Sequence, residues 1–137
     1  MNGRRLITVT AEIEKLRRTI FYLDDDEGCL KVFREMFDGE YDVRTEATLA
    51  EARRSLAEHP ADIVISDQMM PEISGKEFLR EVAGAHPASY RVLLTGAITV
   101  GDVVREVGAG VIHAFVVKPW TEEEMRRVLE RARSLVG

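Results

Sequence analysis

Four apolar runs in this sequence each end in polar residues that could do chemistry together. Asp24 and Asp25 follow the first run, Asp67 the second, Thr95 the third and Lys118 the last. Three carboxylates placed together repel one another, and a Mg²⁺ ion, which proteins hold through one or two carboxylates, relieves that repulsion. A carboxylate flanked by a metal ion, a hydroxyl group and an ammonium group is suited to attack a phosphorus atom. We therefore predict that Asp67 is a nucleophile that forms an aspartyl phosphate.

These side chains can meet only if the runs are strands of one sheet. A short, β-branched apolar run bounded by turn residues is typical of a strand buried on both faces of a parallel sheet. The predicted strands are Thr19–Leu23, Tyr41–Thr45, Ala61–Ser66, Tyr90–Leu94 and Ala114–Val117. Helical patterns alternate with them, which indicates βαβ units with right-handed crossovers. We predict an α/β fold of the flavodoxin-like type, a doubly wound five-stranded parallel sheet in the order 2-1-3-4-5 with helices on both faces.

Capping residues predict where three of the helices begin. Thr48 with Glu51, Ser74 with Glu77, and Thr121 with Glu124 each form a capping box. The helix predicted at Thr99–Val107 is weaker, because it holds a glycine and several β-branched valines. The N-terminal residues Met1–Arg18 are ambiguous: Val9, Ile13 and Leu16 fit one face of a short helix, and an extended or frayed segment fits equally.

Composition limits the class of protein. The chain has 137 residues, of which 45% are hydrophobic, and this suits one globular domain with a core. Its net charge of −5 argues against direct nucleic-acid binding. The single cysteine, Cys29, fits a reducing compartment, and no apolar run reaches the length of a membrane span. We expect a cytoplasmic protein without membrane contact.

The four strand ends together are similar to the motifs of a known family. The pieces YLDDDE, VISDQMMPEISG, VLLTGA and FVVKPW resemble, in order and spacing, those of the CheY-like receiver domains of bacterial two-component response regulators. The resemblance covers residues 19–135. It implies an N-terminal extension at residues 1–18 and a receiver domain at residues 19–137. One departure is Asp26, where the family more often has glutamate.

The resemblance also implies roles for individual residues. Asp67 resembles the phosphorylated aspartate. Asp25 resembles the direct Mg²⁺ ligand, and Asp24 resembles its acidic neighbour, which often acts through water. The backbone carbonyl of Met69 resembles the remaining protein ligand to the metal.

Four further positions match the part of the family that responds to phosphorylation. Thr95 resembles the hydroxyl that moves to bind the phosphoryl group, and Lys118 resembles the lysine that pairs with it. Phe115 lies where the family has its rotating aromatic switch. Pro119 would follow a cis peptide bond, which costs little before proline.

The function implied by the resemblance is a phosphorylation switch. A sensor histidine kinase or phosphotransfer protein would phosphorylate Asp67, and the surface formed by the family's fourth helix, fifth strand and fifth helix would signal to an output domain or protein partner. A phosphorylation-dependent homodimer is expected on the same basis. The segment around Trp120 resembles receivers that precede transcription-activating or phosphodiesterase modules. No enzymatic activity is expected beyond self-phosphorylation and self-dephosphorylation.

Two alternatives stay open at this point. A Mg²⁺-dependent phosphatase of the haloacid dehalogenase type also uses an aspartate nucleophile, which here would be Asp24 within a D-x-D pattern. Such an enzyme would have a second acidic pair late in the chain, where only Glu122–Glu124 occur. The other alternative is an interaction domain that is never phosphorylated and has no affinity for Mg²⁺.

Overall fold

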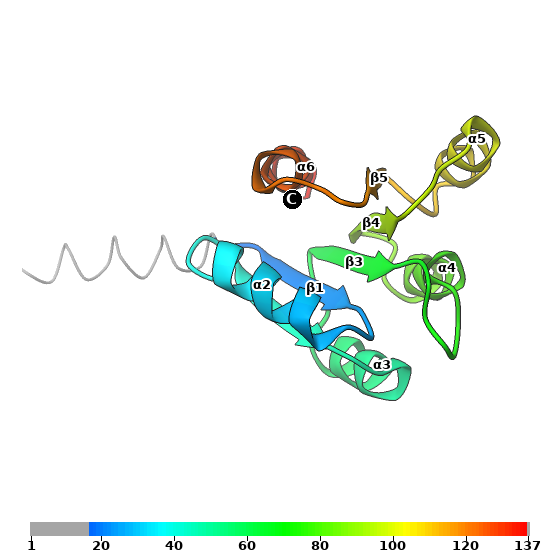
Figure 1. The fold of residues 1–137 in the computed structure, drawn as a ribbon. Helices are drawn as coiled ribbons and strands as arrows, with labels where there is room; N and C mark the ends of the chain where they lie inside the picture. Colours follow the sequence, from blue (N-terminus) through cyan, green and yellow to red (C-terminus); the bar gives the residue numbers. More distant parts are fainter. Residues whose placement is uncertain (1–16, 137) are drawn as a thin grey trace, which may run out of the picture.

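The computed structural model describes residues 17–136, so the segment predicted as either a helix or an extension lies almost wholly outside the described residues. Ten elements alternate along the chain (Figure 1). They are β1 (Thr19–Leu23), α2 (Glu27–Phe37), β2 (Asp42–Glu46), α3 (Leu49–Glu58), β3 (Ile63–Asp67), α4 (Gly75–Ala85), β4 (Tyr90–Thr95), α5 (Val100–Gly108), β5 (Ala114–Val117) and α6 (Glu122–Leu135).

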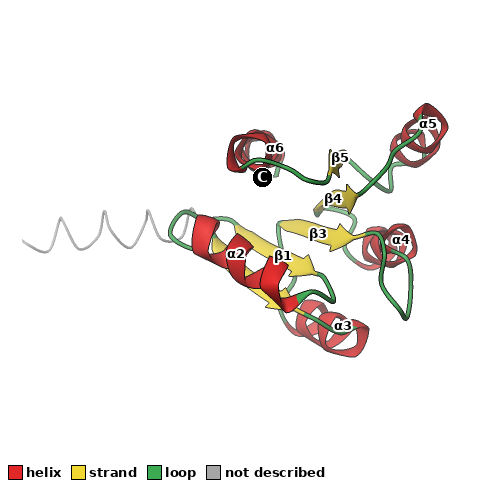
Figure 2. Cartoon of the chain, in the orientation of Figure 1, coloured by secondary structure: helices red, strands yellow, loops and turns green. Residues whose placement is uncertain are grey.

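The strands form one parallel sheet in the order β2-β1-β3-β4-β5, as predicted (Figure 2). Helices α2 and α6 cover one face, and α3, α4 and α5 lie on the other (Figure 1). The chain passes from one half of the sheet to the other between β1 and β3. Ligands of such folds bind outside the carboxyl ends of the strands at this switch point.

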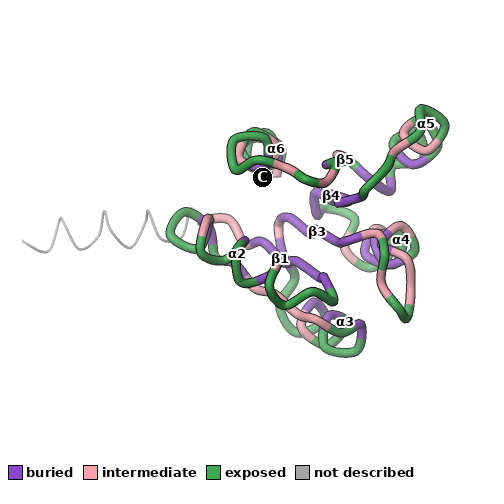
Figure 3. The backbone as a smooth tube through the Cα atoms, viewed as in Figure 1, coloured by how far each residue is buried: buried purple, intermediate pink, exposed green. Residues whose placement is uncertain are grey.

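The sheet separates two apolar cores. In Figure 3 the tube is coloured as buried along β1, β3 and β4. Residues along β1 alternate between them because successive side chains of a strand point to opposite faces. Ile20 and Tyr22 pack with α2 and α6, whereas Phe21 and Leu23 pack with α3 and α4. Side chains two residues apart on β1 therefore share a face.

The three predicted capping boxes begin α3, α4 and α6, with Thr48, Ser74 and Thr121 as N-caps. Thr99 also accepts a hydrogen bond from the Asp102 amide, so it is the N-cap of α5 rather than its first residue. Three strands differ by one or two residues from their predicted bounds. In particular, β3 extends to Asp67, because Asp67 still pairs with Leu94 of β4. Within residues 17–136, no helix has the length and apolar character needed to cross a membrane.

Candidate functional site

The two central strands bring two carboxylates together at the switch point. Asp67 is the last residue of β3, and Asp24 directly follows β1. The register pairs Leu23 with Ser66, so the residues that come next on these neighbouring strands lie side by side. Both carboxylates are buried, with 1% exposure for Asp24 and 5% for Asp67. Buried carboxylates are rare unless a cation accompanies them.

Asp25 completes an acidic cluster with these two residues. One carboxylate oxygen from each of Asp24, Asp25 and Asp67 lies within 4.8 Å of the other two. Asp25 is exposed, so the cluster opens to solvent on its side. Carboxylate oxygens are the ligands that Mg²⁺ prefers, and Mg²⁺ commonly uses few of them and keeps several waters. The donor set therefore fits a magnesium ion.

The Asp24 carboxylate is held from two sides. The Tyr22 hydroxyl donates a hydrogen bond of 2.6 Å to Oδ2, and the Asp26 amide donates one of 2.9 Å to Oδ1. Burial raises the pKa of Asp24, and these two hydrogen bonds oppose that effect. Burial also raises the pKa of the Tyr22 phenol, and its hydrogen bond to Asp24 adds to the shift. The phenol therefore stays protonated and donates a hydrogen bond to Asp24.

Lys118 supplies the cation of the site. Its ammonium group forms an ion pair with Asp67 Oδ1. Its backbone amide donates to the Thr95 carbonyl at 2.8 Å, and the Lys118–Pro119 peptide bond is cis, as predicted. Burial lowers the pKa of Lys118, but the hydrogen bond and charge of Asp67 and the charge of Asp24 outweigh burial, so the pKa is raised. The lysine stays protonated beside the cluster.

The second oxygen of Asp67 contacts the loop that follows β3. The Met69 amide donates to Oδ2 at 3.1 Å, and the Met69 side chain is 79% exposed. The Gln68 side chain accepts from the Lys76 amide at 3.0 Å, which joins this loop to the first turn of α4. The loop is thereby held against the site, while the role predicted for the Met69 carbonyl stays a prediction.

Thr95 and Phe115 lie on the neighbouring strands β4 and β5, and neither belongs to the acidic cluster. The Thr95 hydroxyl donates a hydrogen bond of 2.8 Å to the Ala97 carbonyl, within the loop that follows β4. Phe115 is half-buried on β5, on the face covered by α3 and α4. Both residues line a cavity of about 110 Å³ beneath the loop between β4 and α5. Their predicted switch roles thus have a common location.

Two residues of the site were missed by sequence reasoning. Tyr22 contacts Asp24, and the signal for it was the two-residue spacing along β1. Gly75 begins α4, and a Cβ atom built there would lie 2.3 Å from the Asp67 carbonyl oxygen and 2.7 Å from Leu93 Cδ1. Only glycine allows α4 to approach the end of β3 so closely.

Comparison with known proteins identifies the family. Residues 20–130 match the response regulator receiver domain. The chain belongs to this family. As a receiver domain, it is a component of two-component signal transduction. Neither the haloacid dehalogenase reading nor the reading as an unphosphorylated interaction domain finds support in the comparisons.

Curated relatives are transcriptional regulators that are much longer than this receiver domain. It is 29% identical over 119 residues to the hydrogenase transcriptional regulatory protein HoxA of Cupriavidus necator, covering 87% of this chain and 25% of the relative. It is 30% identical over 114 residues to the transcriptional regulatory protein GlrR of Escherichia coli, covering 82% and 26%. The chain thus spans about a quarter of the length of these relatives.

Solved structures share the fold. The BeF3-activated receiver domain of DrrB, a Thermotoga maritima OmpR/PhoB homologue, is similar with a TM-score of 0.76 and 26% identity, covering 86% of this chain and 98% of that one. A receiver domain protein from Clostridium thermocellum has a TM-score of 0.77 at 24% identity, with coverage of 85% and 94%.

Proposed function

We propose that Asp67 accepts a phosphoryl group from the phosphohistidine of a sensor histidine kinase or phosphotransfer protein. An Asp67 carboxylate oxygen would form a bond to phosphorus while the bond between phosphorus and the histidine nitrogen breaks, and the imidazole leaves. The observation that carries the proposal is the buried Asp67 carboxylate, paired with Lys118 and adjoining two further carboxylates. Burying carboxylates lowers the stability of a fold, so several of them gathered at one site indicate a function.

Asp24, Asp25 and Asp67 would hold the Mg²⁺ ion, with the Met69 carbonyl as a further ligand. Bound there, the ion would neutralise negative charge on the phosphoryl oxygens. Lys118 would contribute a second positive charge from the side of β5 and pair with a phosphoryl oxygen. Positioning and charge neutralisation are the main contributions that a protein makes to phosphoryl transfer.

The switch would begin at Thr95. To bind the phosphoryl group, its hydroxyl must leave the Ala97 carbonyl, and the loop before α5 must move with it. Phe115 would then turn into the cavity that it shares with Thr95. This is a local change of charge that biases an element with two positions.

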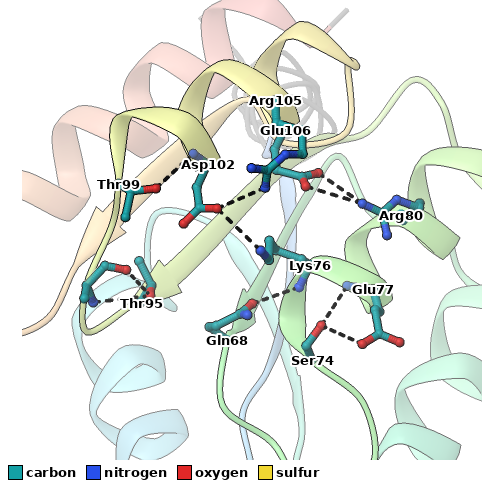
Figure 4. A network of polar contacts seen from close by, with 11 residues as sticks. Gln68, Ser74, Lys76, Glu77, Arg80, Thr95, Thr99, Asp102, Arg105 and Glu106 are labelled. Carbon is teal, nitrogen blue, oxygen red and sulfur yellow. Dashed lines mark hydrogen bonds and ion pairs between the residues drawn. The ribbon is translucent and has the colours of Figure 1, made fainter.

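Helix α5 is suited to carry the response because polar contacts hold it in place. Its only buried residue is Glu106, which accepts from Arg80 of α4 at 3.3 Å (Figure 4). Asp102 forms an ion pair with Lys76 of α4 at 3.8 Å (Figure 4). Elements with few apolar contacts move at lower cost than those embedded in a core.

The exposed side of α5 is apolar. Val100 is 81% exposed, Val104 67% and Val107 46%, and Val117 of the adjoining strand β5 is 42% exposed. Exposed apolar patches on a small domain commonly mark an interaction site. We assign the surface of α5, β5 and α6 to the output partner and to a phosphorylation-dependent homodimer. A cytoplasmic location and the lack of turnover of external substrates remain predictions.

The test uses Trp120, which lies two residues beyond Lys118. Its fluorescence would be followed during a titration with Mg²⁺ and then with beryllofluoride, a phosphoryl mimic. We expect a saturable response to both, and intact-mass spectrometry after treatment with a small phosphodonor should detect one added phosphoryl group. In Asp67→Asn, the beryllofluoride response and the added mass should disappear. Phosphorylation that persists in Asp67→Asn would reject Asp67 as the acceptor.

A further inference from the structure

Tyr22 is a buried tyrosine whose hydroxyl donates a hydrogen bond to Asp24. It lies on β1 two residues before Asp24, and both residues are 1% exposed. Because the spacing of two places their side chains on one face of the strand, the phenol reaches the carboxylate directly. The resulting hydrogen bond, 2.6 Å to Asp24 Oδ2, has the length typical of a hydroxyl donor to a carboxylate.

The Tyr22 ring is fixed by its neighbours. It packs edge-on against Phe33 of α2, with ring centroids 5.0 Å apart. Phe33 in turn contacts Phe37 at 4.9 Å and Trp120 at 6.3 Å. The ring is 1% exposed and packed against Phe33, and these contacts favour one rotamer. The hydroxyl therefore presents a donor at a fixed position.

The Asp24 carboxylate is consequently held on both oxygens. Tyr22 donates to Oδ2 and the Asp26 amide donates to Oδ1 at 2.9 Å. Two donors on opposite oxygens prevent the carboxylate from rotating freely about its Cβ–Cγ bond. They leave each oxygen a further lone pair for the acidic cluster with Asp25 and Asp67.

We propose that Tyr22 is a positioning residue of the metal site: it orients Asp24 for Mg²⁺ without contacting the ion or the reacting atoms. This inference rests on the Mg²⁺ site in the proposed function. Groups that hydrogen-bond to a ligating carboxylate fix its orientation, and their removal typically costs metal affinity. The phenol also supplies the donor that buried Oδ2 needs, since a carboxylate oxygen without a partner is unfavourable in the interior.

Tyr22→Phe tests this role because it removes the hydroxyl and keeps the ring against Phe33. Tyr41→Phe is the matched control. Tyr41 is also a 1% exposed tyrosine of the same apolar core, but it directly precedes β2, at the amino ends of the parallel strands, whereas the acidic cluster lies at their carboxyl ends. Mg²⁺ affinity would be measured by isothermal titration calorimetry and by Trp120 fluorescence, with thermal melts to confirm that each variant is folded.

We expect Tyr22→Phe to weaken Mg²⁺ binding about tenfold, the lower end of the effect of losing such a partner, and Tyr41→Phe to change it less than about twofold. A purely structural hydroxyl would lower the melting temperature and leave the affinity unchanged. Equal Mg²⁺ affinity in wild type and Tyr22→Phe would therefore overturn the inference while leaving the Mg²⁺ site intact. A wild-type protein that binds no Mg²⁺ would overturn the proposed function and this inference together.

A double-mutant cycle decides whether Tyr22 acts through Asp24. In the Asp24→Asn background, Tyr22→Phe should cause no further loss of Mg²⁺ affinity, because the carboxylate that it orients is gone. A loss of the same size in both backgrounds would contradict positioning through Asp24 and overturn the inference.

Discussion

The ammonium group of Lys118 forms an ion pair with Asp67, although their strands are not neighbours. Strand β4 lies between β3 and β5, so the lysine spans two strand spacings, on the order of 10 Å. Its backbone amide is anchored on the Thr95 carbonyl at the end of β4. Lys118, which directly follows β5, thus contacts the end of β3 through its side chain and the end of β4 through its backbone.

Replacing Lys118 should separate metal binding from the response to phosphorylation. Lys118→Met removes a positive charge next to the carboxylates, so Mg²⁺ affinity should rise roughly fivefold, about 1 kcal/mol of removed repulsion. The beryllofluoride response should fall, because no ammonium group remains to pair with the phosphoryl mimic. Both are measured by Trp120 fluorescence. Lys76→Met, a lysine paired with Asp102 instead, is the control and should bind Mg²⁺ as wild type does. A full beryllofluoride response in Lys118→Met would contradict this account.

Gly75→Ala should destabilise the domain by about 2 kcal/mol, a typical cost of overpacking. The added methyl group would lie 2.3 Å from the Asp67 carbonyl oxygen, which is backbone and has no room to move. Gly84→Ala in the same helix is the control: nothing lies within 4 Å of its Cβ position, so it should stabilise by about 0.5 kcal/mol through helix propensity. Urea unfolding measures both. Similar effects of the two substitutions would show that the close approach at Gly75 is unimportant.

Asp24 should make the metal-free domain less stable as pH rises. Burial raises its pKa in the folded state, so between the unfolded and folded pKa values the folded protein binds more protons than the unfolded chain. Stability is therefore lost as pH rises through this window and stays lower above it. Asp24→Asn should raise the free energy of unfolding by on the order of 1 kcal/mol near pH 7 and change it little near pH 3. Such a gain is common when a residue kept for function is replaced.

Urea unfolding in the presence of a chelator, at both pH values, tests the Asp24 prediction. Asp102→Asn should change the free energy of unfolding in the opposite direction, lowering it at neutral pH. The pKa of Asp102 is lowered by a hydrogen bond from Thr99 and by the charges of Lys76 and Arg105, so its contribution is present at neutral pH and is lost as pH falls. An Asp24→Asn gain of equal size at both pH values would mean that ionisation of Asp24 is not the cause.

The valines of α5 predict where phosphorylation-dependent association occurs. Val104→Glu places a charge in the exposed apolar patch, and it should abolish dimerisation induced by beryllofluoride. The free energy of unfolding of the monomer should change by less than about 0.5 kcal/mol, because the side chain is 67% exposed. Val32→Glu, a 47% exposed valine of α2 on the other face of the sheet, is the control. Sedimentation velocity distinguishes the outcomes, and an unchanged dimer in Val104→Glu would place the interface elsewhere.

Most of the fold could be predicted because four of the five strands, all but β2, are short apolar runs with a distinct end. The alternation with helices indicated a doubly wound parallel sheet, and the strand order of that fold type placed Asp24, Asp25, Asp67 and Lys118 at the carboxyl ends of the strands. Strand bounds were less predictable, since they depend on pairing across the sheet. Strand β2 begins at Asp42 rather than Tyr41, because Asp42 pairs with Thr19 while Tyr41 turns into the core.

Side-chain partners could not be predicted from periodicity. The bond between Tyr22 and Asp24 depends on a rotamer fixed by Phe33, which comes from a separate helix. Helix α5 faces α4 with Glu106, which pairs with Arg80, and its valines face outward. Both arise from tertiary packing: the spacing of two residues indicates that Tyr22 and Asp24 share a face, but it does not predict their hydrogen bond.

Helix α5 buries the charged residue Glu106 and exposes its valines, so its contacts respond to ionic strength. The contacts Arg80–Glu106 and Lys76–Asp102 are partly exposed, and salt at 1 M reduces the screening length to about 3 Å. Strongly hydrated salts such as sulfate also favour the burial of apolar surface, here the outward-facing valines. Raising the sulfate concentration therefore weakens the ion pairs that hold α5 and favours association through its exposed valines. The dimerisation of this domain at a given protein concentration should increase with sulfate.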